Sequence, residues 1–430
     1  MNTIVNPERS QWNEILKRPT QTYKQIEKTV LEVFEAIQND GDAAIEKYTQ
    51  KFDGISLNSF EVTPEEITAA VANLDADLKE AITLAKSNIE AFHKAQRTEK
   101  IELETAPGVK CWQEKRPIQK VGLYIPGGTA PLFSTILMLA VPAKIAGCKE
   151  VVLCTPPDKE GNINPTILFT AHLCGIDKIF KVGGIQAIGA MTFGTPSIPK
   201  VYKIFGPGNQ FVTVAKQMAT QFNVSIDMPA GPSELLVVAD DTAEAAFVAS
   251  DLLSQAEHGV DSQVILVSTS KDLIKAVSQE VQEQLQVLPR KAIAEKAIVK
   301  SKLIFVETKE LALELIDEYG PEHFIVATSN NAFFVENIAN AGSVFIGNYT
   351  PESAGDYASG TNHTLPTNGY AKQYSGVNLD SFMKSMTFQE ITPEGIQNIG
   401  KAIELMAAAE GLHAHKNAVT LRLTQLANSN

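Results

Sequence analysis

Short segments rich in β-branched residues alternate with helical segments between Lys120 and Ile346. This alternation predicts a mostly parallel sheet that is covered by helices on both faces. The expected strands are Lys120–Ile125, Glu150–Cys154, Lys178–Val182, Lys203–Phe205, Leu235–Val238, Gln263–Val267, Lys302–Phe305, Phe324–Ala327 and Ser343–Ile346. The expected helices between them are Leu132–Ala146, Pro165–Cys174, Ile185–Phe193, Phe211–Phe222, Ala243–Ser254, Lys271–Gln286, Lys309–Tyr319 and Ala332–Ala339.

The alternating region divides into two series, with a break near Met228–Pro232. Before the alternating region, apolar residues at three- and four-residue spacing predict helices over Gln25–Gln38 and Asp42–Phe52. A further helix is expected from Pro64, with interruptions, to about Arg97, and the tail from Pro393 to about Leu426 is expected to be helical with an interruption at Gly411. The expected fold class is α/β, with two tandem Rossmann-like domains (incomplete and doubly wound), a helical N-terminal region and a helical C-terminal tail. The domains are expected at residues 1–104, 105–230, 231–378 and 379–430. Because the tail is too short to fold alone, it is expected to pack on another domain or subunit.

The composition is that of an ordinary globular protein, with 44% hydrophobic residues, 20% charged residues and a net charge of −13. A phosphate backbone requires a basic surface, so nucleic acid is not an expected partner. The most apolar run, Leu132–Ala146, is too short to span a membrane, and no membrane partner is expected. No secretory signal is recognisable and the four cysteines form no CxxC pair, which together favour the cytoplasm.

Residues 351–369, PESAGDYASGTNHTLPTNG, form an unusual polar segment. Glycines and prolines interrupt it too often for a helix, and it is too polar for a core strand. It carries Glu352, Asp356 and His363 together with several hydroxyl groups. A folded protein rarely keeps so long a polar loop unless the loop binds something, so we expect it to line a functional site.

Gln255 and His258 lie three residues apart at a predicted helix end. Both side chains then point the same way, which suits two ligands of one metal ion. Asp356 on the polar loop and His415 on the tail are candidates to complete the set. Histidine and oxygen donors without a thiolate suit zinc, with manganese or cobalt as substitutes. The alternative is a histidine that only caps the helix.

Glu322 and His323 follow Gly320-Pro321 and precede an apolar strand. An acid beside an imidazole at a strand start suits proton transfer, because both groups can be tuned toward neutral pH. The alternative is a helix-to-strand connection whose charges face solvent. His363 is either a second polar anchor or a loop residue bonded to backbone, and Ser233 is a further candidate hydroxyl of the site.

Three glycine-rich turns connect strands to helices in the first series, at Ile125–Gly128, Val182–Gly184 and Phe205–Asn209. Glycine in such turns lets a phosphate approach the helix N-terminus at the carboxyl edge of a parallel sheet. None of the turns matches GxGxxG, because Phe211 stands where the third glycine of Gly206-Pro207-Gly208 would be. Each turn is therefore open to a nucleotide-binding or a purely structural interpretation.

Taken in order, these segments resemble the histidinol dehydrogenase family. The resemblance extends from about Tyr124 to Arg422, and the helical N-terminal region also fits in length and character. The matching stretches are Tyr124-Ile125-Pro126-Gly127-Gly128, Gly183-Gly184-Ile185-Gln186-Ala187, Ile204-Phe205-Gly206-Pro207-Gly208-Asn209, Asp227–Glu234, Ser254–Gly259, Gly320–His323, Pro351–Gly369 and Glu410–Ala418.

The resemblance implies a cytoplasmic oxidoreductase of histidine biosynthesis. It implies oxidation of L-histidinol to L-histidine by way of L-histidinaldehyde, with two successive hydride transfers to NAD. It also implies one Zn²⁺ per subunit and a homodimer whose active sites are shared between the subunits.

Roles carried over by matched position follow from the same resemblance. Zinc ligands would be Gln255, His258, Asp356 and His415, with His415 coming from the other subunit through an exchanged tail. Glu322 and His323 would be the catalytic acid–base pair. Substrate contacts would be Ser233, Gln255, His258, His323, Asp356, His363, Glu410 and His415. Contacts to NAD would be Tyr124, Gln186 and Asn209.

Two features depart from the expected patterns. NAD would bind without the usual glycine fingerprint, and Lys372 stands where the family often carries an arginine. Two other functions remain open on the sequence: a related zinc- and NAD-dependent dehydrogenase of another small amino or sulfonated alcohol, and a zinc-stabilised nucleotide sensor without turnover. Glu410 and His415 favour an amine-and-imidazole substrate over the first, and the Glu322-His323 pair speaks against the second.

Overall fold

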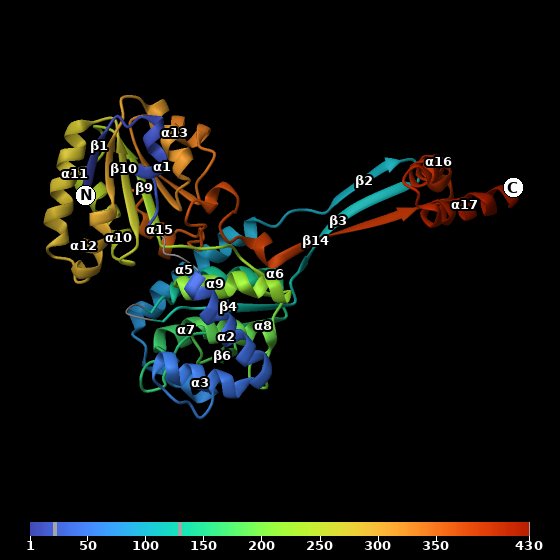
Figure 1. The fold of residues 1–430 in the computed structure, drawn as a ribbon, viewed down its shortest axis with the longest axis horizontal. Helices are drawn as coiled ribbons and strands as arrows, with labels where there is room; N and C mark the ends of the chain where they lie inside the picture. Colours follow the sequence, from blue (N-terminus) through green and yellow to red (C-terminus); the bar gives the residue numbers. More distant parts are fainter. Residues whose placement is uncertain (20–23, 128–130, 430) are drawn as a thin grey trace. The chain divides into compact units, whose positions relative to one another are not determined.

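The computed structural model describes residues 1–19, 24–127 and 131–429 (Figure 1). Contacts within the chain group it into two compact units, and each unit combines two separate stretches of sequence. The larger unit joins Met1–Gln96 to Ile118–Phe382. The smaller unit joins Arg97–Pro117 to Met383–Asn430.

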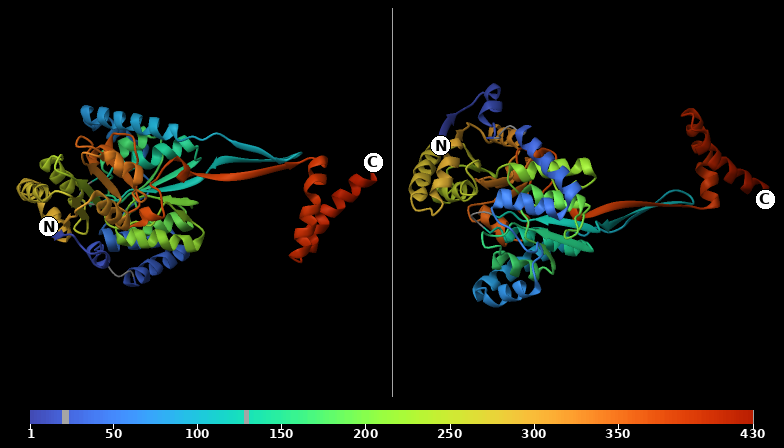
Figure 2. Two further views of the ribbon diagram at one scale, coloured as in Figure 1. Left: turned by 90° about the horizontal axis from the view of Figure 1, so that it is seen from above. Right: turned by 60° about the horizontal axis from the view of Figure 1, so that its bottom comes forward.

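The first sheet of the larger unit has five parallel strands in the order β6-β5-β4-β7-β8. The strands are β4 (Lys120–Tyr124), β5 (Glu150–Cys154), β6 (Lys178–Phe180), β7 (Lys203–Phe205) and β8 (Ser225–Ile226). The core on one face includes α4 (Pro64–Asn73), α5 (Ala76–Ala95), α6 (Ser134–Ala146) and α7 (Pro165–Leu173). The core on the other face includes α2 (Lys24–Asp40), α3 (Asp42–Asp53), α8 (Gly184–Phe193), α9 (Gln210–Ala219) and the 3₁₀ turn η2 (Thr220–Phe222). The N-terminal helices, blue in both views of Figure 2, therefore complete the two layers that cover this sheet.

The second sheet of the larger unit has six parallel strands in the order β1-β11-β10-β9-β12-β13. The strands are β1 (Asn2–Val5), β9 (Glu234–Ala239), β10 (Gln263–Ser268), β11 (Lys302–Phe305), β12 (His323–Ala327) and β13 (Ser343–Ile346). One face packs on α10 (Ala245–Ala256), α11 (Lys271–Leu285) and α12 (Lys291–Lys300). The other face packs on α1 (Trp12–Ile15), α13 (Lys309–Tyr319) and α14 (Asn331–Asn337). Short elements complete the unit: η1 (Arg9–Gln11), α15 (Glu352–Tyr357), η3 (Tyr370–Lys372) and η4 (Leu379–Phe382).

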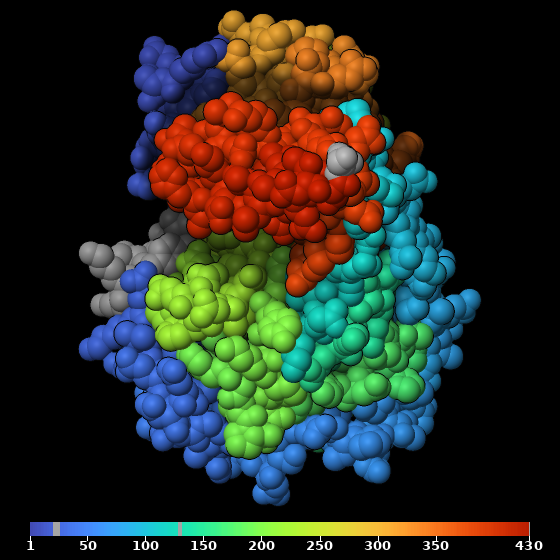
Figure 3. Space-filling model, turned by 90° about the vertical axis from the view of Figure 1, so that its right-hand side faces the viewer, coloured from blue at the N-terminus to red at the C-terminus, as the bar shows by residue number. Residues whose placement is uncertain are grey.

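The smaller unit is built from an antiparallel sheet and two helices. Its strands are β2 (Ile101–Ala106), β3 (Val109–Pro117) and β14 (Met383–Ile391), in the order β14-β3-β2. Trp112 and Phe388 face each other across β3 and β14, with ring centres 5.2 Å apart. The helices α16 (Pro393–Ala409) and α17 (His413–Asn428) pack against each other and form the red block of atoms in Figure 3. Thr392 caps α16 and Gly411, at φ 76°, allows the turn before α17.

The predicted α/β class with parallel sheets and helical ends is confirmed. Four expected strands agree with the structure residue for residue, namely β5, β7, β11 and β13. Strands β1, β2, β3, β8 and β14 and helix α12 were not predicted. Strand β1 is mostly exposed and lies at a sheet edge, so it lacks the apolar pattern that marks the central strands. The four domains, with limits at 104, 230 and 378, stay a prediction.

The expectation that residues 351–369 contain no helix is wrong, because α15 occupies Glu352–Tyr357. Pro351 precedes the first helical residue, where a missing N–H costs no helical hydrogen bond. Position 355 of this helix must be glycine, because a Cβ there would lie only 2.7 Å from the ring of Phe345. Close packing on β13 therefore requires the glycine that made the segment look like a loop.

Arg18 ties the N-terminal segment to the start of β9. Its Nε donates to Glu234 Oε1 at 2.5 Å and a terminal nitrogen donates to Oε2 at 2.8 Å. The side chains of Arg18 and Glu234 are only 14% and 2% exposed, and the guanidinium lies 4.0 Å from the ring centre of Tyr319. Burial opposes the charge on Arg18, but the interaction with Glu234 outweighs it and the pKa of Arg18 is raised. The two-pronged geometry makes this a buried ion pair with a fixed orientation.

Arg18→Gln should lower the free energy of unfolding by roughly 3–5 kcal/mol, because it leaves the Glu234 carboxylate buried without its cation. Urea denaturation followed by circular dichroism measures the change. Lys275→Ala is the matched control, since it breaks an exposed pair with Asp272 and should change stability by less than about 0.5 kcal/mol. Equal losses in the two variants would contradict a structural role for the buried pair.

Candidate functional site

A cleft of about 1310 Å³ runs along the carboxyl edge of the first sheet toward the start of the second. The three glycine-rich turns border it through Gly127, Gly184 and the Gly206–Asn209 turn. Gly206 has a φ of 127°, and a Cβ there would lie 2.0 Å from the carbonyl oxygen of Tyr124. This turn therefore needs glycine for its own packing, while its position on the cleft also suits a nucleotide. Gly128, which belongs to the first turn, lies outside the described residues.

Glu322 and His323 stand at the entry to β12, and both are buried, with exposed fractions of 6% and 3%. The solvent-facing alternative for this pair is therefore wrong. The backbone N–H of Glu234 donates to Glu322 Oε2 at 2.8 Å, and the Nδ1–H of His323 donates to the carbonyl oxygen of Glu234 at 3.2 Å. One residue of β9 thus holds both side chains, and it leaves His323 Nε2 as the nitrogen able to exchange a proton.

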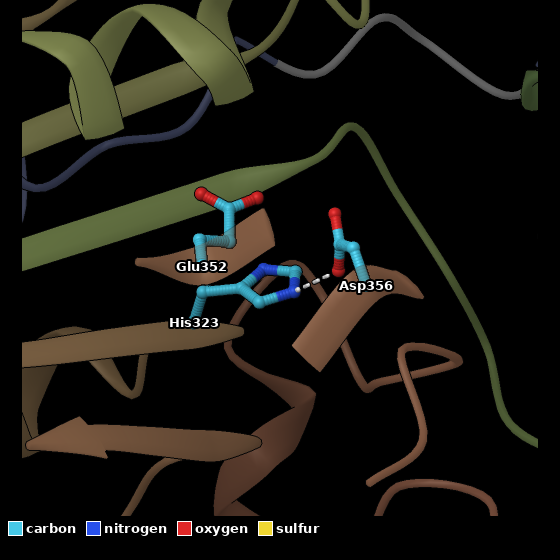
Figure 4. A group of neighbouring side chains, drawn as sticks. All are labelled: His323, Glu352 and Asp356. Carbon is cyan, nitrogen blue, oxygen red and sulfur yellow. Dashed lines mark ion pairs between the residues drawn. The ribbon is translucent and has the colours of Figure 1, made fainter. Parts of the chain in front are cut away.

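Acidic groups surround His323 on several sides (Figure 4). The Nε2 atom of His323 lies 3.4 Å from Asp356 Oδ1. His323, Glu352 and Asp356 each offer one atom that could bind a metal ion, and these three atoms lie within 4.8 Å of one another. Burial lowers the pKa of His323, but the charges of Glu352 and Glu322 outweigh it and the pKa is raised. Burial raises the pKa of Asp356, but the interaction with His323 outweighs it and the pKa is lowered. This arrangement stabilises a positive charge on the imidazole ring.

Glu352 is a member of this cluster that carries no predicted role. It is 1% exposed, and burial raises the pKa of its carboxyl group despite the opposing influence of His323. In the sequence, only its position in the polar segment indicated that Glu352 belongs to the site. The helix α15 puts Glu352 and Asp356, four residues apart, on one face, and this brings both side chains toward His323.

The polar segment is anchored to the first sheet's helices by two neighbouring residues. His363 Nδ1–H donates to the Asp356 carbonyl oxygen at 2.8 Å, so that Nε2 accepts from the Thr135 hydroxyl at 3.1 Å. Asn362 donates to the carbonyl oxygen of Met138 at 2.6 Å. His363 therefore lies on the cleft wall with its tautomer set by its partners, and Ser233 lines the same cleft.

Of the four predicted metal ligands, Gln255 and Asp356 lie beside His323, and His258 lines the same cleft. Gln255 is 1% exposed, with its Nε2 3.3 Å from His323 Nδ1 and its buried Oε1 without a hydrogen-bond partner among the described residues. His258 lines the cleft close enough to Asp356 for their charges to interact; burial nevertheless lowers the pKa of its ring. His258 supplies a neutral imidazole, Asp356 a carboxylate and Gln255 a carbonyl oxygen, and these ligand types fit a zinc ion. His323 and Glu352 are further donors at the same place.

Glu410 and His415 belong to the smaller unit. Glu410 ends α16 and His415 lies in the first turn of α17, and both side chains are exposed. Exposed carboxylate and imidazole groups are available to bind a ligand. Their roles stay predictions.

The three residues predicted to contact NAD lie at the first sheet. The Tyr124 hydroxyl accepts a hydrogen bond from the Gly184 N–H at 3.1 Å, and burial raises the pKa of this phenol to about 12. Gln186 is 1% exposed and donates to Asp53 Oδ2 at 2.9 Å. Asn209 is exposed on the cleft and caps α9 through Val212 N–H. The cleft exceeds the size of ordinary small-ligand pockets, so it has room for a dinucleotide and a small substrate.

Among the described residues, no helix is both long and apolar enough to cross a membrane.

Known proteins resemble this chain along almost its entire length. The family described as histidinol dehydrogenase matches residues 16–423. A histidinol dehydrogenase from Bacteroides thetaiotaomicron is 60% identical over 426 residues, covering 99% of this chain and 100% of that protein. One from Haemophilus influenzae is 52% identical, covering 99% and 100%. The crystal structure of histidinol dehydrogenase from Elizabethkingia anophelis is 56% identical with a TM-score of 0.97, covering 99% and 98%.

Agreement of this extent in sequence and in backbone shows that the chain belongs to the histidinol dehydrogenase family of oxidoreductases.

Proposed function

We propose that this chain catalyses the final step of histidine biosynthesis, the four-electron oxidation of L-histidinol to L-histidine through L-histidinaldehyde, with NAD and zinc. The observation that carries the proposal is the buried Glu322–His323 pair, which Glu234 holds at the end of a cleft. The names of the relatives support the substrate, and the geometry supports two successive proton-coupled oxidations at one place.

Zinc would be held by Gln255, His258 and Asp356 of one subunit and His415 of the other. When bound, the ion would orient the amine and imidazole of the substrate, which are both good zinc donors. The unpartnered Gln255 Oε1 supports this assignment, because a buried carbonyl oxygen is costly without a hydrogen bond or a cation. Ser233, His323, His363 and Glu410 would complete the substrate contacts.

NAD would lie in the cleft beside Tyr124, Gln186 and Asn209 and would accept hydride from the substrate carbon. Its pocket forms without the GxGxxG fingerprint. The Gly206–Asn209 turn and the start of α9 provide backbone N–H groups at the carboxyl edge of the sheet, where an anionic group is favoured.

His323 would take the hydroxyl proton in the first oxidation. The Glu234 carbonyl keeps the proton of the ring on Nδ1, so Nε2 is the accepting atom. The nearby carboxylates of Glu322 and Glu352 would stabilise the imidazolium that results. Glu322 would then remove a proton from water as the water attacks the aldehyde, which gives a hydrate whose second oxidation yields the carboxylate.

The protein would act in the cytoplasm as a homodimer. The helices α16 and α17 leave several large apolar side chains uncovered, including Leu405, Met406 and Leu421 at 60%, 66% and 61% exposure. Exposed apolar groups on a helix pair favour an interface with another subunit. The exchange of this tail would bring Glu410 and His415 to the partner's site.

His258→Asn should lose zinc and nearly all NADH production from L-histidinol, because one ligand of the metal is removed. Metal analysis and a steady-state assay on the same preparations measure both. His172→Asn, an exposed histidine on α7, is the matched control and should keep both properties. If the native protein forms no NADH from L-histidinol, the proposed reaction is wrong, and full activity after complete metal removal would reject the role of zinc.

Glu322→Gln should slow oxidation of L-histidinaldehyde by roughly 10²–10⁴-fold, and it should slow the first oxidation less, because water activation belongs to the second half-reaction. Single-turnover measurements that start from the alcohol and from the aldehyde separate the two. Glu336→Gln, at an exposed position on α14, controls for the loss of one carboxylate. Equal damage to both half-reactions would argue against this role for Glu322.

Hybrid dimers should regain activity when the two subunits carry complementary defects. A subunit with His415→Ala and a subunit with Glu322→Gln and His323→Ala would together form one site with every wild-type group. Mixed refolding, isolation of the hybrid by two affinity tags and a steady-state assay test the expectation. Inactive hybrids of verified composition would instead favour sites contained in a single chain.

A further inference from the structure

Helix α5 carries a buried histidine that none of the proposed reaction steps uses. His93 is 0% exposed, and its ring Nδ1 lies 2.8 Å from the carbonyl oxygen of Ile89, one turn earlier in the helix. Because a carbonyl oxygen can only accept, the proton of the ring is on Nδ1 and Nε2 is an acceptor. Burial lowers the pKa of His93 despite this hydrogen bond, which keeps the ring neutral. A buried acceptor of this kind is costly unless a donor reaches it.

The donor is Asn362, which belongs to the polar segment and lies 269 residues further along the chain. Its Nδ2 lies 3.3 Å from His93 Nε2 and also donates to the carbonyl oxygen of Met138 on α6 at 2.6 Å. Its Oδ1 accepts from the N–H of Thr364 at 3.0 Å. Both hydrogens and the oxygen of the amide are thus in use, and three partners fix the side chain.

Helix α5 holds the polar segment at two neighbouring points as well. Asn88 donates to the carbonyl oxygen of Ala358 at 2.8 Å. Gly360, at φ 114°, passes so close to the helix that a Cβ there would lie 2.9 Å from the carbonyl oxygen of Asn88. Asn88 is exposed, whereas His93 is buried, so the contact of His93 is the one shielded from water, where a hydrogen bond is electrostatically stronger.

The anchored residue directly precedes His363, which lines the cleft. The Asp356 carbonyl oxygen and the Thr135 hydroxyl set the tautomer of the His363 ring, but they can hold the ring only where the main chain has already placed it. Thr135 and Met138 lie three residues apart on α6, so His363 and Asn362 bind the same face of that helix. The link from His93 to Asn362 therefore determines where the His363 ring stands.

We propose that His93 is a positioning residue for substrate binding, which fixes Asn362 and thereby keeps the His363 ring in the orientation that contacts substrate. The proposal rests on the proposed function, in which His363 contacts L-histidinol. Glu322 and His323 are held separately, by Glu234. His93 should therefore influence the binding of substrate and leave the proton transfers largely intact.

Two amide substitutions separate the roles of the two ring nitrogens. The oxygen of Gln in His93→Gln can reach the place of Nε2 and accept from Asn362, whereas Asn in His93→Asn is one methylene too short. His93→Asn should raise KM for L-histidinol by about ten-fold, because a buried amide loses a partner, and should change kcat by less than about two-fold. His93→Gln should keep KM within about three-fold of the native value. Steady-state assays of the zinc-loaded, full-length protein at saturating NAD⁺ measure both constants.

Hydrogen exchange followed by mass spectrometry, without substrate, provides a readout that does not depend on turnover. Peptides that cover residues 356–366 should exchange faster in His93→Asn than in the native protein or in His93→Gln, while peptides from β5 should not change. Ile82→Val trims another buried residue of α5 that forms no side-chain hydrogen bond. It is the control for a general loss of packing and should alter neither KM nor the exchange of this segment.

A double substitution tests whether His93 acts through His363. In a His363→Ala background, His93→Asn should raise KM by less than about two-fold further. Asn362→Ala breaks the same link from the other side and should raise KM like His93→Asn, so it replaces that variant if the protein does not fold.

Equal KM values in the two amide variants, unchanged exchange in His93→Asn, or the same rise in KM with and without His363 would each overturn the positioning role. These results leave the proposed function standing as long as the native protein forms NADH from L-histidinol. Failure of the native protein to form NADH overturns both.

Discussion

Glu234, the first residue of β9, makes the contacts on which the site depends. Its N–H binds the Glu322 carboxylate, its carbonyl oxygen binds the His323 ring, and its side chain receives both Arg18 and the Asn368 N–H at 2.7 Å. One buried residue thus connects the N-terminal segment, the acid–base pair and the end of the polar segment. Because Glu234 is only 2% exposed, its negative charge depends on the ion pair with Arg18. The stability of the fold and the orientation of Glu322 and His323 therefore depend on the same residue.

The parallel arrangement of the strands explains where the cleft forms. All five strands of the first sheet end at the same edge, and the turn after β7 needs glycine at Gly206 because a Cβ there would lie 2.0 Å from the carbonyl oxygen of Tyr124. The same edge leads through residues 227–233 into β9 of the second sheet, so the cleft and the Glu322–His323 pair become neighbours. Neither sheet alone has both.

The concentration of acidic groups around His323 has a chemical consequence. Glu322, Glu352 and Asp356 would repel one another if all were charged in a buried place, and the raised pKa values of His323 and Glu352 show how protons relieve this repulsion. A divalent cation near Asp356 and Gln255 would relieve it further. Two separate observations therefore support a bound cation. The Gln255 Oε1 atom has no hydrogen-bond partner among the described residues, and the acidic groups around His323 carry charge that a cation would balance.

Local sequence patterns determined the alternation of strands and helices, four strands residue for residue, and the candidates Glu322, His323, Gln255, His258 and Asp356, since these depend on periodicity and on residue types close together in the chain. The edge strand β1, the β14–β3 pairing, the α15 helix within the polar segment and the approach of Glu352 to His323 depended on tertiary structure. The same holds for Asp53, which meets Gln186 across 133 residues of sequence. Their physical causes are packing against distant residues and hydrogen bonds across long separations, and no local periodicity records such contacts.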